Sequence, residues 1–242
     1  MNNVLAVIPA RYESTRFPGK PLALLKGRAI ILHVAARARK CRRVDDVIVA
    51  TDDERIRAVV ETAGYRAVMT AKNHACGTDR ITEAVANTDA RIIVNIQGDE
   101  PMIDPPSVDR AVEALLNDPA LNVATLAVPI TDIEEFHNPN TVKTVMDNNG
   151  MALYFSRSPI PYRRGAMEKF PLFKHLGLYV YRREFLLQFS RMEQGILEMT
   201  EQLEQLRILQ NGIGIKVVIT DKDSIGIDTP EDLKRAEALL DV

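Results

Sequence analysis

The 242-residue chain has the size and composition of a single α/β domain, or of a domain with an insertion, that can bury a real core. Its net charge of −2 gives nucleic acid no overall electrostatic footprint, so any anion site must be local. The two cysteines, Cys41 and Cys76, form no C-x-x-C motif, no hydrophobic stretch approaches about 18 residues, and the N-terminus lacks a signal-peptide pattern. We therefore expect a cytoplasmic protein without membrane or nucleic-acid partners.

The first predicted strand leads into a cationic loop. The run from Val4 to Ile8 has the length and β-branched content of a buried strand. The loop from Pro9 to Leu22 follows it, stiffened by prolines and carrying Arg11, Arg16 and Lys20. Since α/β sheets bind ligands where such loops leave the strands, this loop suits a polyanion such as a nucleoside triphosphate. It is neither a P-loop nor a dinucleotide fingerprint, and the alternative is a solvated basic loop.

The rest of the first half alternates between helical and strand patterns. We expect helices at 30–39, 53–63 and from about 78, and strands at 47–51, 68–70 and 91–97. The basic run at 37–43 is interpreted as structural, because cations suit a helix C-terminus. The alternation implies parallel strands joined by right-handed crossovers, and hence a Rossmann-like α/β fold with a mostly parallel sheet.

Two polar stretches follow strands of this half. In the stretch at 73–80, Gly77 can bring backbone close to a ligand and Thr78 can cap a helix, so composition alone leaves a binding site and a helix start equally open. Asp99 and Glu100 follow a strand that is apolar on both alternations and therefore central. These acids could cap the helix near residue 106, but Asp99 is well placed for Mg²⁺, which takes one or two carboxylates plus phosphate oxygens.

The second half departs from the regular alternation. We expect strands at 121–129, 141–146, 151–155, 176–181 and 215–219, and helices at 197–209 and from 230 onwards. We interpret 130–190 as a partly antiparallel insertion packed on the first half, within a single domain of residues 1–242. The charged residues of the 197–209 helix are mostly explained by surface ion pairs. Thr229 should be the N-cap of the last helix, with Asp232 at N3, which leaves Asp228 unexplained by helix chemistry.

Six motifs occur in an order that resembles a known family. They are A-R-Y-E-S-T-R-F-P-G-K-P-L at 10–22, V-N-I-Q-G-D-E-P-M-I at 94–103, A-L-Y-F-S-R-S-P-I-P at 152–161, H-L-G-L-Y-V-Y-R at 175–182, L-E-Q-L-R at 203–207 and G-I-D-T-P-E-D-L at 226–233. Together they span nearly the whole chain. The chain resembles the nucleotidyltransferases that activate 3-deoxy-manno-octulosonate (Kdo), the family of CMP-Kdo synthetase.

The resemblance implies a reaction, a cofactor and a set of site residues. The reaction is Mg²⁺-dependent cytidylyl transfer from CTP to Kdo for lipopolysaccharide biosynthesis, by a homodimer to which 130–190 contributes. The implied CTP-binding residues are Arg11, Ser14, Arg16, Lys20, Gly77, Thr78 and Arg80. The implied sugar-binding residues are Gln97, Arg157, His175, Tyr179, Glu204 and Gln205. The implied metal ligands are Asp99 and Asp228, which form the catalytic set with Lys20.

The chain departs from the family pattern at two positions. Cys76 stands where the family usually has serine, and Asp79 stands where it usually has glutamate. Two rival functions stay open: a cytidylyltransferase for another acidic sugar, such as an amino-substituted Kdo or a sialic acid, and a catalytically silent nucleotide-binding protein. The intact pair of Asp99 and Asp228 argues against the silent protein, because nucleotide binding alone does not require both carboxylates.

Overall fold

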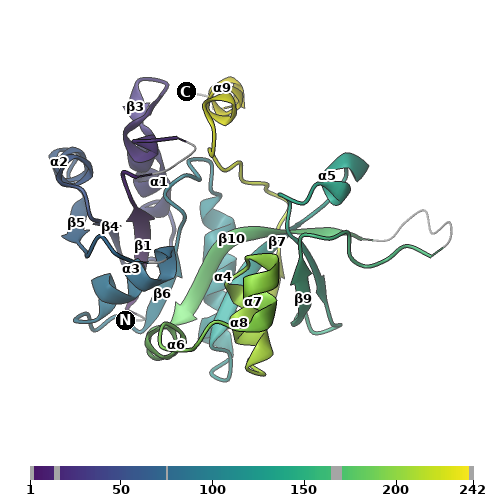
Figure 1. The fold of residues 1–242 in the computed structure, drawn as a ribbon. Helices are drawn as coiled ribbons and strands as arrows, with labels where there is room; N and C mark the ends of the chain where they lie inside the picture. Colours follow the sequence, from purple (N-terminus) through teal and green to yellow (C-terminus); the bar gives the residue numbers. More distant parts are fainter. Residues whose placement is uncertain (1–2, 14–16, 75, 165–170, 240–242) are drawn as a thin grey trace.

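The computed structural model describes residues 3–13, 17–74, 76–164 and 171–239. Its main sheet has the order β11-β7-β10-β6-β1-β4-β5, with β8 and β9 attached at β10 (Figure 1). The strands are β1 (Val4–Ala10), β2 (Leu24–Leu25), β3 (Arg28–Ala29), β4 (Asp46–Thr51), β5 (Arg66–Met69), β6 (Ile92–Asn95), β7 (Val123–Pro129), β8 (Lys143–Met146), β9 (Ala152–Ser156), β10 (Phe173–Arg182) and β11 (Lys216–Ile219). The helices are the 3₁₀ turn η1 (Lys20–Leu22), α1 (Ile30–Ala38), α2 (Glu54–Thr62), α3 (Gly77–Val85), α4 (Pro105–Asn117), α5 (Ile133–His137), α6 (Arg183–Phe189), α7 (Ile196–Glu201), α8 (Gln205–Gln210) and α9 (Pro230–Leu239).

The first half of the chain confirms the predicted parallel alternation. β1 pairs in parallel with β4 and β6, and β4 pairs in parallel with β5. Alternate residues of β1 enter different cores: Ile8 packs in one core with Val34 of α1, whereas Val7 packs in the other with Ile81 of α3. Helices therefore cover both faces of the sheet, and the loops after β1 and β6 meet at the same edge. This is the predicted Rossmann-like α/β fold.

The predicted antiparallel region joins the main sheet through β10. This strand lies between β6 and β7 and runs antiparallel to both, while β8 pairs antiparallel with β10 and with β9. The region is therefore partly antiparallel, as predicted, and it joins the first half through the pairing of β10 with β6. Between Leu176 and Tyr179 the register of β10 against β7 shifts, so the strand bulges at residues 177–178.

Several helix predictions need correction. The expected helix at 197–209 is broken into α7 and α8, because Gln202 adopts the left-handed conformation with φ 55° and ψ 48°. Its charges are not all at the surface, since Glu198 and Arg207 are both buried and form an ion pair of 2.6 Å. Thr78 does not cap α3, whose N-cap is Cys76 without a side-chain hydrogen bond. The hairpin β2–β3 and the helices α5 and α6 were not predicted.

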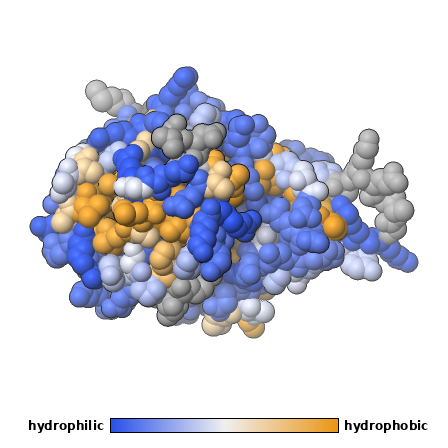
Figure 2. Space-filling view, turned by 90° about the horizontal axis from the view of Figure 1, so that it is seen from above, coloured by the Kyte–Doolittle hydropathy of each residue, from blue (hydrophilic) through white to orange (hydrophobic). Residues whose placement is uncertain are grey.

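The outer surface is mostly polar. Seen from above, hydrophilic residues cover most of the molecule, and hydrophobic residues gather in one area over the N-terminal half (Figure 2). Within the ranges that the structure describes, every helix is too short or too polar to cross a bilayer.

Candidate active site

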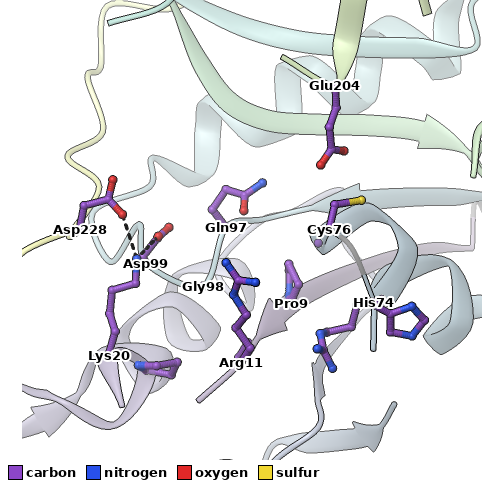
Figure 3. Close-up of a pocket in the computed structure, with 14 residues that line it drawn as sticks. Pro9, Arg11, Lys20, His74, Cys76, Gln97, Gly98, Asp99, Glu204 and Asp228 are labelled. Atoms are coloured by element: carbon purple, nitrogen blue, oxygen red, sulfur yellow. Dashed lines mark hydrogen bonds and ion pairs between the residues drawn. The ribbon is translucent and has the colours of Figure 1, made fainter. Parts of the chain in front are cut away.

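A cavity of about 380 Å³ lies at the edge of the sheet where β1 and β6 end. It is lined by residues of the cationic loop, of the start of α3, of the segment after β6 and of the segment before α9. Figure 3 shows Lys20, Asp99 and Asp228 together at one end of this cavity, with Cys76 and Glu204 at the other. We call it the first cavity.

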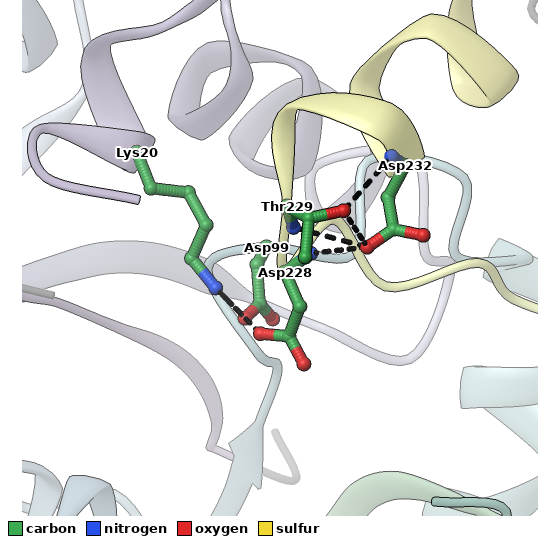
Figure 4. Close-up of polar contacts among 5 residues, drawn as sticks. All are labelled: Lys20, Asp99, Asp228, Thr229 and Asp232. Atoms are coloured by element: carbon green, nitrogen blue, oxygen red, sulfur yellow. Dashed lines mark hydrogen bonds and ion pairs between the residues drawn. The ribbon is translucent and has the colours of Figure 1, made fainter. Parts of the chain in front are cut away.

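Lys20 joins the two predicted metal ligands. Its ammonium Nζ lies 2.5 Å from Asp99 Oδ2 and 3.1 Å from Asp228 Oδ1 (Figure 4). The lysine side chain is 14% exposed, so these contacts are partly shielded from water. Gly19 makes the turn before it, with φ 72° and a Cβ position only 3.2 Å from the Tyr12 ring. The fold thus brings together three residues from widely separated parts of the chain, as the sequence predicted.

Backbone contacts hold both aspartates at this edge. The N–H of Ile227, next to Asp228, donates to the carbonyl of Asp99 at 2.9 Å. A Cβ on Gly98 would lie 2.6 Å from the carbonyl oxygen of Pro9, so any side chain there would displace the segment that carries Asp99. On the other side, the predicted capping box is confirmed: Thr229 N–H donates to Asp232 Oδ2 at 3.0 Å, and Asp232 N–H donates to Thr229 Oγ1 at 3.2 Å.

The neighbouring acid Glu100 has a different environment. Burial, with a further contribution from the charge of Asp99, raises the pKa of Glu100 to about 7. Neither acid caps the helix that follows, because Asp104 accepts the hydrogen bond of Ser107 N–H at 2.9 Å. The alternative role of Asp99 as part of a helix cap is therefore wrong.

The donor chemistry of this edge fits a magnesium ion. Two carboxylates converge on one position that already accepts a cationic group, the Lys20 ammonium. Mg²⁺ prefers carboxylate oxygens, usually one or two, and completes its shell with phosphate oxygens and water. Asp99 and Asp228 would hold the ion, and phosphate oxygens of a bound triphosphate would be its further ligands.

The other predicted CTP-binding residues differ in their surroundings. Arg11, Gly77 and Arg80 line the first cavity. Arg80 is 4% exposed and donates to Thr70 Oγ1 at 2.5 Å and to Asp52 Oδ2 at 2.7 Å. Thr78 instead donates to Glu204 Oε2 at 2.6 Å. Ser14 and Arg16 lie outside the described residues.

A second cavity of about 380 Å³ adjoins the first and shares Gly77, Gln97 and Glu204 with it. It lies beside the bulge of β10, and the Gly177 carbonyl accepts a hydrogen bond from Gln97 Nε2 at 3.1 Å. The structure brings five of the six predicted sugar-binding residues into its lining: Gln97, His175, Tyr179, Glu204 and Gln205.

Three buried polar atoms at the second cavity have no hydrogen-bond partner among the described residues. They are Asn95 Oδ1, Tyr179 OH and Gln205 Nε2. Asn95 on β6 is the cross-strand partner of Tyr179 on β10. Because a buried polar group without a partner is costly, these atoms indicate a ligand that supplies both donors and acceptors, such as a polyhydroxylated sugar. Asn95 was not predicted as a site residue, although an amide inside the apolar run 92–96 indicates a buried polar group.

Two titratable side chains of the second cavity, His175 and Tyr179, are uncharged. Burial lowers the pKa of His175 to about 3, so the imidazole is neutral, and its Nε2 lies 2.9 Å from Thr125 Oγ1. Burial also raises the pKa of Tyr179 well above its usual value, which keeps the phenol protonated. In the first cavity, burial and then the charge of Glu204 raise the pKa of Cys76 to about 12, so this thiol is not a nucleophile.

Arg157, the sixth predicted sugar-binding residue, lines neither of these cavities. Its guanidinium donates to the carbonyl oxygens of Glu201 at 2.8 Å, Pro139 at 3.1 Å and Gln202 at 3.4 Å. The predicted sugar-binding role of Arg157, in which its guanidinium would clamp the carboxylate of the sugar acid, stays a prediction.

Known proteins are similar to this chain in sequence and in architecture. The cytidylyltransferase family matches residues 5–221. The 3-deoxy-manno-octulosonate cytidylyltransferase of Geotalea daltonii is 52% identical over 242 residues and that of Syntrophotalea carbinolica is 50% identical over 246, covering 96% and 98% of both chains, respectively. A solved structure of CMP:2-keto-3-deoxy-manno-octonic acid synthetase complexed with CTP matches with a TM-score of 0.93 at 45% identity, covering 98% of this chain and 97% of that one.

A more distant match shows the fold alone. The 4-diphosphocytidyl-2C-methyl-D-erythritol synthase of Anaerococcus prevotii has a TM-score of 0.65 at 14% identity, covering 98% of this chain and 97% of that one. The near full-length matches at about half identity are decisive. The chain belongs to the cytidylyltransferase family and, within it, to the 3-deoxy-manno-octulosonate cytidylyltransferases.

Proposed function

We propose that this protein transfers the cytidylyl group of CTP to Kdo in a Mg²⁺-dependent reaction that yields CMP-Kdo and pyrophosphate for lipopolysaccharide biosynthesis. The observation that carries the proposal is the meeting of Lys20, Asp99 and Asp228 at one end of a cavity whose other end opens beside a cavity lined by polar side chains. One end has the chemistry for a metal-bound triphosphate. The other has the chemistry for a hydroxylated acceptor.

The residues of the first cavity bind and stabilise charge. Arg11 and Lys20 line this cavity and would bind the phosphates, and a fixed cation there would stabilise the pyrophosphate that leaves. Asp99 and Asp228 would hold a magnesium ion, which would supply further charge stabilisation at the α-phosphate, and a second ion would lower the pKa of the attacking hydroxyl. Transfer of this kind depends on positioning and electrostatics and needs no covalent nucleophile, which agrees with a protonated Cys76.

The residues of the second cavity orient the acceptor. Asn95 Oδ1 can accept a hydrogen bond from a sugar hydroxyl, Gln205 Nε2 can donate one, and Tyr179 OH can do either. Glu204 lies in the lining of both cavities and accepts the hydrogen bond of Thr78, so it couples the acceptor side to the start of α3.

An assay of pyrophosphate release tests the proposal and separates its rivals. The protein is incubated with Mg²⁺, one of CTP, UTP, ATP or GTP, and one of Kdo, an amino-substituted Kdo or a sialic acid. We expect release with CTP, and fastest with Kdo. The resemblance implies that the stretch at 76–80 selects the cytosine base, and equal use of ATP or GTP would refute this role. Binding of CTP without release on any acceptor would favour the silent nucleotide-binding protein.

Replacing Asn95 by leucine should impair acceptor use without destabilising the fold. The variant loses a hydrogen bond to the sugar, so the KM for Kdo should rise by about three- to tenfold, while the KM for CTP stays unchanged. The thermal midpoint should not fall, because leucine removes a buried acceptor that has no partner among the described residues. Thr144→Val, which changes a buried polar residue of β8 outside both cavities, is the matched control. Unchanged KM values in Asn95→Leu would remove Asn95 from the site.

A further inference from the structure

A buried lysine contacts the backbone of a segment that lines the second cavity. Lys143, on β8, is 0% exposed, and its ammonium Nζ donates to the carbonyls of Asn138 at 2.9 Å and Thr141 at 2.6 Å and to the carbonyl of Arg157. An ammonium has three donors, and here each meets a backbone oxygen. Lys143 therefore ties the segment 138–141 to the end of β9.

Arg157 extends these contacts to a third segment. Its guanidinium donates to the carbonyl of Pro139 and to those of Glu201 and Gln202 at the end of α7. The Glu201 carboxylate also accepts from the backbone N–H of Arg157 at 2.9 Å and from Ser156 Oγ at 2.6 Å. The side chains of Lys143, Arg157 and Glu201, which we call the frame, thus connect the segments 138–141, 156–157 and 201–202.

The connected segments continue directly into the lining of the second cavity. Asn140 and Thr141 contribute to one wall, and the residues from Gln202 to Gln205 contribute to another. The three frame residues themselves are absent from the lining of both cavities. They are therefore placed to act on the cavity through its walls and not by contact with a ligand bound there.

The break between α7 and α8 shows what the frame holds in place. Gln202 has φ 55°, which is unfavourable for a residue with a side chain, and two of the carbonyls that Arg157 binds belong to Gln202 and its neighbour Glu201. This left-handed residue turns the chain so that Glu204 and Gln205 reach the cavity. Without the guanidinium, the two carbonyls and the bend would lose their support.

We propose that Lys143, Arg157 and Glu201 are positioning residues that fix the two walls of the acceptor cavity. The identity of the acceptor, Kdo, rests on the proposed function, whereas the frame and the walls it holds do not. Arg157 in this role supports the binding of the sugar without touching its carboxylate.

Steady-state kinetics of Lys143→Met and Arg157→Met tests the acceptor role. In each variant the KM for Kdo should rise by about tenfold or more, because misplaced walls cost binding and alignment, while the KM for CTP should stay within about twofold. The double variant should lose little more than the worse single variant, since both act on the same walls. Arg182→Met is the matched control: Arg182 also donates to backbone carbonyls, of Leu115, Asp118 and Leu121, but at the end of β10 away from both cavities.

Amide hydrogen exchange tests the frame independently of turnover. Exchange at 138–142 and 201–205 should accelerate in both variants, with no change in α2 and no such change in Arg182→Met. If Lys143→Met does not fold, Arg157→Met alone carries both measurements. An acceptor KM that rises only in Arg157→Met, with normal exchange, would overturn the proposal and identify Arg157 as a direct carboxylate clamp. Accelerated exchange in the variants, combined with no turnover of Kdo by the unchanged protein, would retain the frame and refute the proposed acceptor.

Discussion

Replacing either Asp99 or Asp228 by asparagine should lower kcat by about a hundredfold or more, while the protein stays folded. Asparagine keeps the size of the side chain but removes the charge that a magnesium ion needs. The backbone contacts that place both residues, from Ile227 to Asp99 and within the capping box of Thr229 and Asp232, do not involve these two carboxylates, so the fold should survive. The measurement is kcat with saturating CTP and Kdo, alongside thermal unfolding.

The double variant tests whether the two aspartates share one ion. Because they would act as a unit, Asp99→Asn combined with Asp228→Asn should lose little more than the worse single variant. Asp221→Asn, on the same segment but 79% exposed and 3.9 Å from Lys222, is the control and should be close to the unchanged protein. Fully multiplicative losses in the double variant would mean that the aspartates work independently, and the shared ion would be refuted.

Replacing Lys20 by alanine should lower kcat/KM for CTP by at least about tenfold, since a charge-assisted hydrogen bond contributes roughly 1.5–3 kcal/mol. The structure adds a second reason: without the ammonium, the carboxylates of Asp99 and Asp228 would face each other with less neutralising charge. Both kcat and the affinity for CTP should fall. Lys40→Ala, an exposed cation beyond the end of α1, should have little effect. Normal kinetics in a folded Lys20→Ala variant would make the loop an ordinary solvated basic loop.

Local sequence patterns were sufficient for most of the fold. The run at 91–97, which is apolar on both alternations, predicted the central position of β6, and Thr229 with Asp232 predicted the start of α9. The helical pattern at 197–209 failed because one residue, Gln202, leaves helical geometry, and periodicity does not report a single left-handed residue. Glu198 and Arg207 were expected among the surface charges of this helix and are instead a buried ion pair, since spacing along a helix does not show what packs over it.

The site was predictable where a residue follows a strand directly or matches a family motif. Asp99 belongs to the first kind, while Lys20 and Asp228 lie in motifs, and the structure brings all three together. Asn95 was not predicted because its neighbours in the chain are hydrophobic and indicate a strand of the core. The partners of Arg157 could not be foreseen, because Pro139 and Glu201 lie far from it in the chain. The homodimer and the cytoplasmic location stay predictions.

The position of β10 between β6 and β7 has a consequence for the order in which the protein folds. The sheet neighbours of β7 are β10 and β11, and both follow it in the chain. A growing polypeptide can therefore pair β5, β4, β1 and β6 early, but its hydrophobic strand β7 must wait for later residues, and such long-range pairing is slow. Asp228 comes later still, so the Lys20 ammonium acquires its second carboxylate only after β11 has been made. A polypeptide that ends between β11 and residue 228 therefore holds Lys20 and Asp99 without their partner.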